Sequence, residues 1–325
     1  MSHYVDKMFS VREAPWHFRE TGPDGRTLIL ADYPGREEAM RAAGHDFEVV
    51  ERPVFVGTET GPVWDEGRWK ALVRLDTGGV LDVADSTYQV VQNGVGWDVV
   101  DALVAEPNVR YETAGVLKGG AVCWVLAWLD EPGEIPGDPS PVLPFVMTSW
   151  SHNGTSSLKA VTTDVRVVCW NTYSAASVAA ERQGREFIFR HTARVMGRIA
   201  EAQGALGLAR ERHEAFMALA TDLAGRPATR RTWDAFLVDF IPMPADALVS
   251  DRVKHNVLAD REKFREILTS PSIEPIAGNR WGMFQAGIEW IDYGRQARSP
   301  ETLFGRTMLR PEPAKAKLLS LVRSA

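Results

Sequence analysis

The sequence predicts an α+β protein: an antiparallel β-sheet of hairpins, followed by helices packed on it in a β-β-β-α-like core, with a mixed, mainly helical C-terminal region. Two patterns predict this class. From about residue 54 to residue 130, runs of alternating apolar and polar residues are separated by glycine-containing turns, which is typical of antiparallel hairpins. Beyond residue 163 the apolar residues recur at helical spacing. The 325 residues are 45% hydrophobic and 25% charged, which excludes disordered and collagen-like chains.

Three segments are expected along the chain. Residues 1–53 form an N-terminal arm, residues 54–210 form the α+β core domain, and residues 211–325 form a mainly helical region packed on that core. The first segment contains scattered prolines and glycines, which favour turns over long elements. We therefore expect it to be loosely structured, with one short helix at residues 36–43.

The first hairpin is expected at residues 69–83. Apolar and polar residues alternate in its first strand: Trp69, Ala71, Val73 and Leu75 alternate with Lys70, Arg74 and Asp76. This pattern predicts a half-buried strand with the face of Trp69 turned toward the core. The run Asp-Thr-Gly-Gly at residues 76–79 predicts the turn, because glycine adopts positive φ without steric cost.

A second hairpin is expected from residues 109–117 and 121–129, and the second of these strands is apolar on both faces, as in a central strand. Residues 97–104 between the hairpins predict a short helix. The stretch 130–144 contains too many prolines for a regular element and is expected to be a surface loop. A third hairpin is expected within residues 145–161.

Helices are predicted at about residues 165–179, 185–208 and 211–224. In the second of them Arg190, Arg194 and Arg198 recur every four residues and so share one stripe. The spacing predicts a basic ridge along this helix. Nearby glutamates could instead pair with these arginines and make the ridge an ordinary solvated face.

The overall charge limits the class of ligand. The chain has 37 basic and 43 acidic residues, a net charge of −6, so any site for a polyanion must be a local patch. Cys123 and Cys169 cannot build a disulfide framework. The N-terminus lacks the order of a signal peptide, and no run of about 18 apolar residues occurs. These observations predict a cytoplasmic protein that does not enter a membrane.

Motifs of the common enzyme classes are missing from the sequence. It contains no phosphate-binding loop, no dinucleotide-binding glycine motif and no paired-cysteine zinc spacing. The seven histidines are scattered, and no two have the i, i+4 spacing of a helical metal site. We therefore expect no cofactor, no resident metal and no catalytic residue.

Cations beside aromatic residues are the strongest functional signal, because phosphates bind arginine and lysine while unstacked bases lie on aromatic rings. Asn171 and Arg166 are candidates for contacting a phosphate or a base edge, although Asn171 could equally cap a helix. The candidate nucleic-acid contacts are Arg166, Asn171, Arg185, Arg190, His191, Arg194, Arg198, Lys70, Arg74, Lys118, Lys159 and Trp150.

Short motifs distributed in order over nearly the whole chain resemble a known family. They are Pro15 to His17; Tyr88 to Asn93; Gly115, Val116, Leu117 and Gly119; Arg166 to Thr172; Arg190 to Thr192; Arg280, Trp281, Gly282, Gln285, Ala286, Glu289, Trp290 and Asp292; and Leu303 to Gly305. In these motifs the chain resembles the phage- and plasmid-borne proteins of domain of unknown function 932. The resemblance implies a bacterial mobile-element setting and a role in handling phage or plasmid DNA. The order of hairpins and basic helix is also similar to the core of phage single-strand annealing proteins, which assemble into rings or filaments.

These observations together favour a protein that binds single-stranded DNA without reading its sequence, forms a homo-oligomer and promotes annealing. Phosphates would contact the arginines, and bases would stack on an exposed tryptophan. Two alternatives stay open. An enzyme acting on a nucleotide or nucleic acid would gather His191, Asn171 and Arg166 in one pocket. A structural or host-interaction protein would contact another protein through its acidic surface and the loop 130–144.

Overall fold

The structure is a computed structural model of the chain. It describes residues 6–11, 27–64, 67–104, 109–129, 132–166, 171–174, 186–189, 199–244, 250–295 and 313–325.

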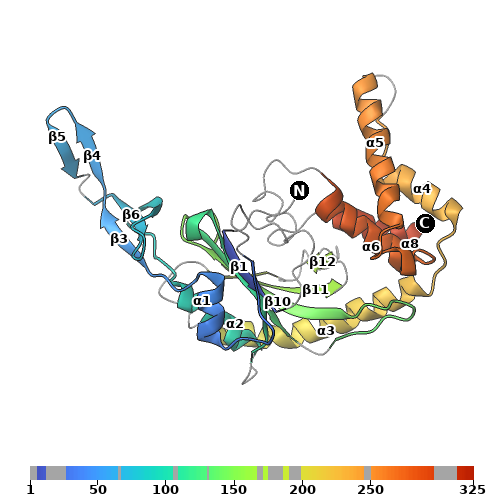
Figure 1. The fold of residues 1–325 in the computed structure, drawn as a ribbon, viewed down its shortest axis with the longest axis horizontal. Coiled ribbons are helices and arrows are strands. Elements are labelled where there is room, and N and C mark those ends of the chain that lie inside the picture. Colours follow the sequence, from blue (N-terminus) through green and yellow to red (C-terminus); the bar gives the residue numbers. More distant parts are fainter. Residues whose placement is uncertain are drawn as a thin grey trace.

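A large sheet forms the centre of the molecule (Figure 1). Its strand order is β12-β11-β10-β9-β8-β1-β2, and β13 also pairs with β11. The strands are β1 (Lys7–Ser10), β2 (Thr27–Ile29), β8 (Tyr111–Leu117), β9 (Val122–Trp128), β10 (Val142–Ser151), β11 (Leu158–Arg166), β12 (Asn171–Ser174) and β13 (Glu186–Phe189). All of these pairs are antiparallel except β1–β2. The α+β class and the hairpins β8–β9 and β10–β11 are therefore confirmed. β1 and β2 come from the segment expected to be loosely structured, yet they extend this sheet.

Three helices lie along one face of the sheet: α1 (Arg36–Ala43), α2 (Asn93–Val104) and α3 (Ile199–Ala224) (Figure 1). The helix expected at 36–43 has those bounds. Trp97 from α2 and Trp150 from β10 are fully buried in the core on this side. The opposite face of the sheet has its own buried cluster, which includes Trp124, Phe145 and Met147.

The C-terminal region is mainly helical, as expected, and it has its own buried core. It contains α4 (Arg230–Phe240), α5 (Asp251–Leu268), the 3₁₀ turn η6 (Glu274–Ile276), α6 (Arg280–Glu289), the π-helical turn η7 (Trp290–Gly294) and α8 (Pro313–Ser324). Phe264, Trp281 and Phe284 are fully buried in this core. Lys315 Nζ and Asp292 lie 2.9 Å apart with both side chains completely buried, so α8 is tied to η7 by an ion pair. None of the described helices is long and apolar enough to cross a membrane.

A separate set of short strands projects from the main sheet on the left of Figure 1. It consists of a three-stranded antiparallel sheet, β3 (Val49–Pro53), β6 (Trp69–Arg74) and β7 (Val80–Asp85), and a two-stranded ribbon, β4 (Phe55–Thr58) and β5 (Gly61–Trp64). We call residues 49–85 the β-extension. The expected hairpin of β6 and β7 is present.

The orientation expected for β6 is wrong. Leu72 is fully buried, whereas Trp69 is 41% exposed and Leu75 is 54% exposed. The apolar face of the strand therefore points to solvent, and the face that carries Lys70 and Arg74 packs inward. This is possible because both cations are neutralised: Lys70 pairs with Glu51 at 2.7 Å and Arg74 pairs with Asp76 at 2.6 Å.

Two of the expected helices are wrong in part, within the residues that the structure describes. Residues 165–166 end strand β11 and residues 171–174 form β12, within the helix expected at 165–179. Residues 186–189 form β13, within the helix expected at 185–208. β-Branched and aromatic residues are frequent in these segments and favour strands, and β10 and β11 offer pairing partners. α3 begins at Ile199 and continues to Ala224, so it joins the end of that helix with the one expected at 211–224.

The proline-rich stretch 130–144 is more tightly packed than a surface loop in the part that the structure describes. Ile135 is buried in the C-terminal core. Asp138 accepts a hydrogen bond of 2.7 Å from the indole Nε1 of Trp281 in α6. The stretch therefore connects the C-terminal core with β10, which begins at Val142.

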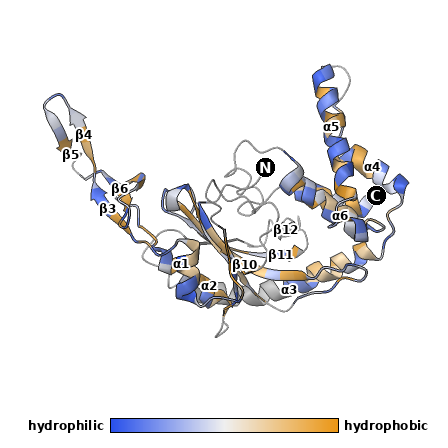
Figure 2. Ribbon diagram, in the orientation of Figure 1, coloured by the Kyte–Doolittle hydropathy of each residue, from blue (hydrophilic) through white to orange (hydrophobic). Residues whose placement is uncertain are grey.

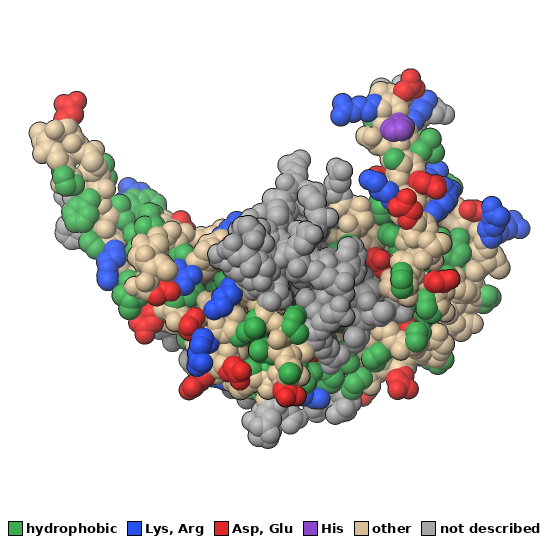
Figure 3. All heavy atoms as spheres, in the orientation of Figure 1, with side chains coloured by type: hydrophobic (Ala, Val, Ile, Leu, Met, Phe, Trp, Pro, Cys, Tyr) green, Lys and Arg blue, Asp and Glu red, His purple; other side chains and the backbone are tan. Residues whose placement is uncertain are grey.

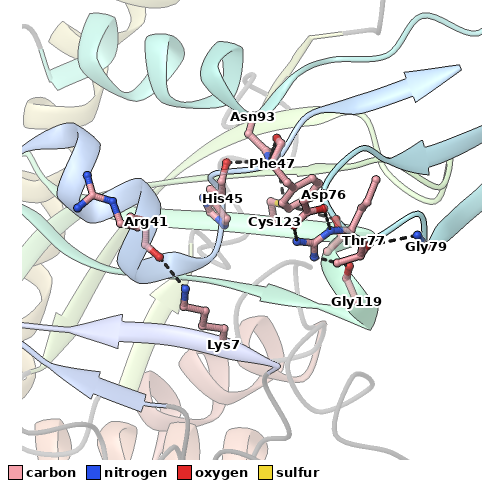
Figure 4. Close-up of polar contacts among 12 residues, drawn as sticks. Lys7, Arg41, His45, Phe47, Asp76, Thr77, Gly79, Asn93, Gly119 and Cys123 are labelled. Atoms are coloured by element: carbon pink, nitrogen blue, oxygen red, sulfur yellow. Dashed lines mark hydrogen bonds and ion pairs between the residues drawn. The ribbon is translucent and has the colours of Figure 1, made fainter.

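Asn93, the first residue of α2, joins three separate parts of the fold. Its amide Nδ2 donates to the backbone carbonyls of His45 and Phe47, at 3.0 and 3.1 Å (Figure 4). Its Oδ1 accepts from Trp150 Nε1 at 2.9 Å and from His152 Nε2 at 2.8 Å. Since Asn93 is buried, these bonds fasten the segment before β3 and the end of β10 to the start of α2.

Neighbours of Asn93 strengthen the same junction. The side-chain amide of Gln92 accepts from the backbone N–H of Val49 at 3.1 Å and donates to its carbonyl at 2.8 Å. Gly96 lies directly against Trp150, where a Cβ would come within 2.5 Å of the indole ring. A larger residue at position 96 would therefore force α2 away from the sheet.

His45 is held neutral in this junction. Its Nδ1 accepts from Trp97 Nε1 at 3.0 Å, so its Nε2 carries the proton and donates to the carbonyl of Gly115 at 2.9 Å. Burial lowers the pKa of His45 to about 4. Both ring nitrogens have partners only in the neutral form.

Replacing Asn93 tests its role as the junction residue. Asn93→Ala leaves the indole N–H of Trp150 and two backbone carbonyls buried without this partner, so we expect the free energy of unfolding to fall by at least about 3 kcal/mol. Urea denaturation measures this change. Asn153→Ala, in the turn after β10, is the matched control and should cost about 1 kcal/mol or less. An equal loss in the two variants would contradict the role.

The buried neutral state of His45 predicts a pH dependence of stability. The folded pKa of about 4 lies below the unfolded value of about 6.5, so the unfolded chain binds the additional proton between these values. Stability should therefore fall by roughly 3 kcal/mol from this group as the pH drops from 6.5 to 4. Urea titrations at several pH values would show this slope. It should be smaller in His45→Gln, which does not titrate.

Candidate functional site at the β11–β12 hairpin

Two candidate residues meet at the hairpin formed by β11 and β12. Arg166 is the last residue of β11, Asn171 is the first residue of β12, and the two are directly opposite each other in the antiparallel ladder. Both are strand residues, whereas the sequence predicted a helix here. Val142 of β10 is the other ladder neighbour of Arg166.

An acid–histidine pair lies two residues before Arg166. Asp164 Oδ1 and His213 Nδ1 are 2.5 Å apart, and the two side chains are only 13% and 12% exposed. His213 belongs to α3, so this contact also fixes the helix against β11. Burial raises the pKa of the Asp164 carboxyl, and the hydrogen bond from His213 offsets part of that increase. A carboxylate that holds a histidine in this way fixes the orientation of its imidazole ring.

The predicted arginine ridge lies outside the described residues. Arg185, Arg190, His191, Arg194 and Arg198 all fall there, so the structure does not test their roles. The structure describes two elements next to these residues. β13 lies between Arg185 and Arg190, and α3 begins directly after Arg198. The segment from 185 to 198 thus connects a strand that pairs with β11 to the helix that carries His213.

Arg74 fastens the β-extension to the main sheet. Its Nη1 donates to the carbonyl of Gly119 at 2.8 Å, and its other nitrogens hold Asp76 at 2.6 and 3.0 Å. The guanidinium carbon lies 3.9 Å from the ring centre of Phe47. A Cβ at Gly120, where φ is +98°, would contact both Phe47 and Arg74. Arg74 is thus used internally, and its hydrogen bonds also lower the pKa of Asp76.

The remaining candidates on the strands differ in accessibility. Lys118 is exposed in the turn between β8 and β9. Lys159 is partly buried in β11, opposite Ser149 and Ile188 in the neighbouring strands. Trp150 is fully buried, so the expectation that bases stack on it is wrong. Its indole ring fills the core and donates to Asn93.

The described surface has no continuous basic track on the face shown in Figure 3, where acidic and basic side chains alternate. Among the residues that the structure describes, no group of three or more His, Cys, Asp or Glu could hold a metal ion. The contact between Asp164 and His213 was not predicted from the sequence. These residues are 49 positions apart, and no local pattern marks them as partners.

The comparison with protein families assigns the chain. The family model described as "Domain of unknown function (DUF932)" matches residues 80–309, which is 230 of the 325 residues. The chain belongs to this family. The DUF932 match covers β7 to α6 and includes the β11–β12 hairpin, Asp164 and His213, whereas β3 to β6 of the β-extension lie before it. No curated protein and no solved structure matches the chain.

Removing His213 should change the titration of Asp164. Without its hydrogen-bonding partner the carboxyl keeps only the effect of burial, so His213→Ala should raise the pKa of Asp164 further. Carbon-detected NMR of the Asp164 carboxyl measures this value. His255→Ala removes an exposed histidine of α5 and should leave it unchanged. A lower pKa in His213→Ala would contradict the pairing.

Proposed function

We propose that this protein handles phage or mobile-element DNA: it binds single-stranded DNA without sequence preference, acts as a homo-oligomer and promotes strand annealing. The observation that carries the proposal is the charge of residues 182–198. This segment contains five arginines and one acid, in a chain whose net charge is −6. Such a local excess of arginine can bind phosphates although the whole molecule repels them at long range.

Two of the candidate cations already have acidic partners within the protein, so we place less weight on them. Lys70 and Arg74 are neutralised by Glu51 and Asp76 and serve the attachment of the β-extension. The phosphate contacts that we propose are therefore Arg166, Arg185, Arg190, Arg194 and Arg198. Because Trp150 is buried, binding would depend mainly on phosphate contacts, and its affinity should decrease steeply with salt.

A second candidate function is favoured by the Asp164–His213 pair. A histidine oriented by a buried carboxylate is the arrangement of a general base, and the strand that carries Asp164 also carries Arg166, which could bind a phosphate. An enzyme that processes a nucleotide or nucleic acid could use this pair, with His213 in the place expected for His191. Cleavage of a labelled oligonucleotide, with and without magnesium, separates this function from binding alone.

Reversing the charge of the ridge tests the binding proposal. The triple variant Arg190→Glu, Arg194→Glu, Arg198→Glu should bind a fluorescent oligo-dT strand at least about tenfold more weakly at about 50 mM salt. The slope of log affinity against log salt should become smaller by about 2, since each contact with a single strand contributes about 0.7. Fluorescence anisotropy measures both quantities.

A charge-matched variant separates this effect from general repulsion. Arg230→Glu, Arg231→Glu, Arg252→Glu makes the same change of net charge at three exposed arginines of α4 and α5. We expect a much smaller effect from it. The proposal fails if the unchanged protein shows no salt-dependent binding, or if both triple variants lose affinity equally.

A further inference from the structure

The β-extension exposes an unusual amount of apolar surface. Figure 3 shows hydrophobic side chains gathered along it, and Figure 2 shows hydrophobic stretches beside hydrophilic ones on its projecting strands. Single exposed apolar residues are ordinary on a protein surface, but a contiguous group marks an interaction site. The exposed members are Phe55 (58%), Val56 (55%), Val63 (52%), Trp69 (41%), Leu75 (54%), Val80 (64%) and Val83 (46%).

The register places three of these side chains, those of Trp69, Val80 and Val83, on one face of the three-stranded sheet. Trp69 and Ala71 lie on the side of β6 that points away from the buried Leu72, because successive side chains alternate. Val83 is directly opposite Ala71 in the ladder, so it lies on the same side. We call this side the outer face. Its apolar residues are Val50, Trp69, Ala71, Val73, Val80 and Val83.

The ribbon of β4 and β5 is apolar on both sides. Val56 is opposite Val63 in the ladder, and the neighbouring Phe55 points to the other side. All three side chains are more than half exposed. A two-stranded ribbon is marginally stable at best in water when nothing packs against it. The ribbon therefore gains stability when another surface covers it.

The outer face carries a positive charge on one edge strand and a negative charge on the other. Arg52 is opposite Ala71 and lies on the edge strand β3, while Asp85 is opposite Trp69 and lies on the other edge strand, β7. When two such faces pack about a two-fold axis parallel to β6, β3 of each copy lies over β7 of the other. Each Arg52 then approaches Asp85 of the second copy, and the valines and Trp69 meet between them.

From this geometry we propose that the outer face of the β-extension is the dimerisation surface of the protein, and that its occupant is the same face of a second copy of this chain. The apolar residues fit an interface core, and the two ion pairs at its edges fix the register. A nucleic-acid strand fits less well, because the described residues of the β-extension include five acids and four bases. The inference does not depend on DNA binding.

Sedimentation of the full chain tests the proposal. Between about 1 and about 100 µM, where interfaces of moderate strength dissociate, the protein should change from one chain of 36.0 kDa to twice this mass. Val83→Glu places a charge in each half of the interface and should weaken dimerisation at least about tenfold. Leu258→Glu, at a residue of α5 that is 56% exposed, is the matched control and should dimerise like the unchanged protein. Circular dichroism and the thermal midpoint should show that both variants fold.

The charge pairs provide a second, independent measurement. Arg52→Glu should weaken the dimer, because it brings two carboxylates together at each edge, and adding Asp85→Arg should restore part of the lost affinity. A protein that remains a monomer over the whole concentration range overturns the proposal. So does a dimer that tolerates Val83→Glu, or one that the second charge reversal does not restore.

Discussion

The buried amide of Asn93 is the constraint on which the arrangement of the other elements depends. One side chain binds the segment that leads into β3, the end of β10 and the start of α2, and it fills all of its donor positions while doing so. A buried amide is costly unless every hydrogen bond is made, so such a residue tolerates only one arrangement of its neighbours. The position of the β-extension relative to the main sheet follows from it, because Gln92 and Asn93 together hold residues 45–49.

Two cations at the base of the β-extension, Lys70 and Arg74, make contacts within the protein. These contacts determine which side of β6 faces solvent. Arg74 reaches across to Gly119 and stacks on Phe47, and Lys70 pairs with Glu51 on the neighbouring strand. With its polar face used for internal contacts, β6 presents its apolar face to solvent. The same ion pairs thus explain why the polar face of β6 packs inward and why its apolar face is exposed.

The sequence predicted correctly those elements whose conformation is set by neighbouring residues. It did not predict those whose conformation depends on a residue that is distant in the sequence. The turn at residues 118–120 and its two strands could be predicted because the glycines that make the turn lie between them, and Gly119 and Gly120 have positive φ. The inward face of β6 could not be predicted, since it depends on Glu51 in another strand. The segment of β13 was predicted to be helical from its apolar spacing. Its strand conformation depends on pairing with β11, which is distant in the sequence. In the candidate site, Arg166 and Asn171 are close in sequence and were predicted together, whereas Asp164 and His213 are not.

The two proposals support each other through the way in which a polyanion binds to an anionic protein. On the binding proposal, a single basic segment on a chain of charge −6 would contact few phosphates, so its affinity at physiological salt would be low. Two such segments held in one dimer would act on the same strand, and the second contact would benefit from a high effective concentration. Dimerisation through the β-extension would then raise the affinity for long strands without adding any phosphate contact to either chain. A short DNA strand that reaches only one basic segment would bind no more tightly to the dimer than to the monomer. The dependence of affinity on DNA length therefore tests the dimer, and its dependence on salt tests the arginines.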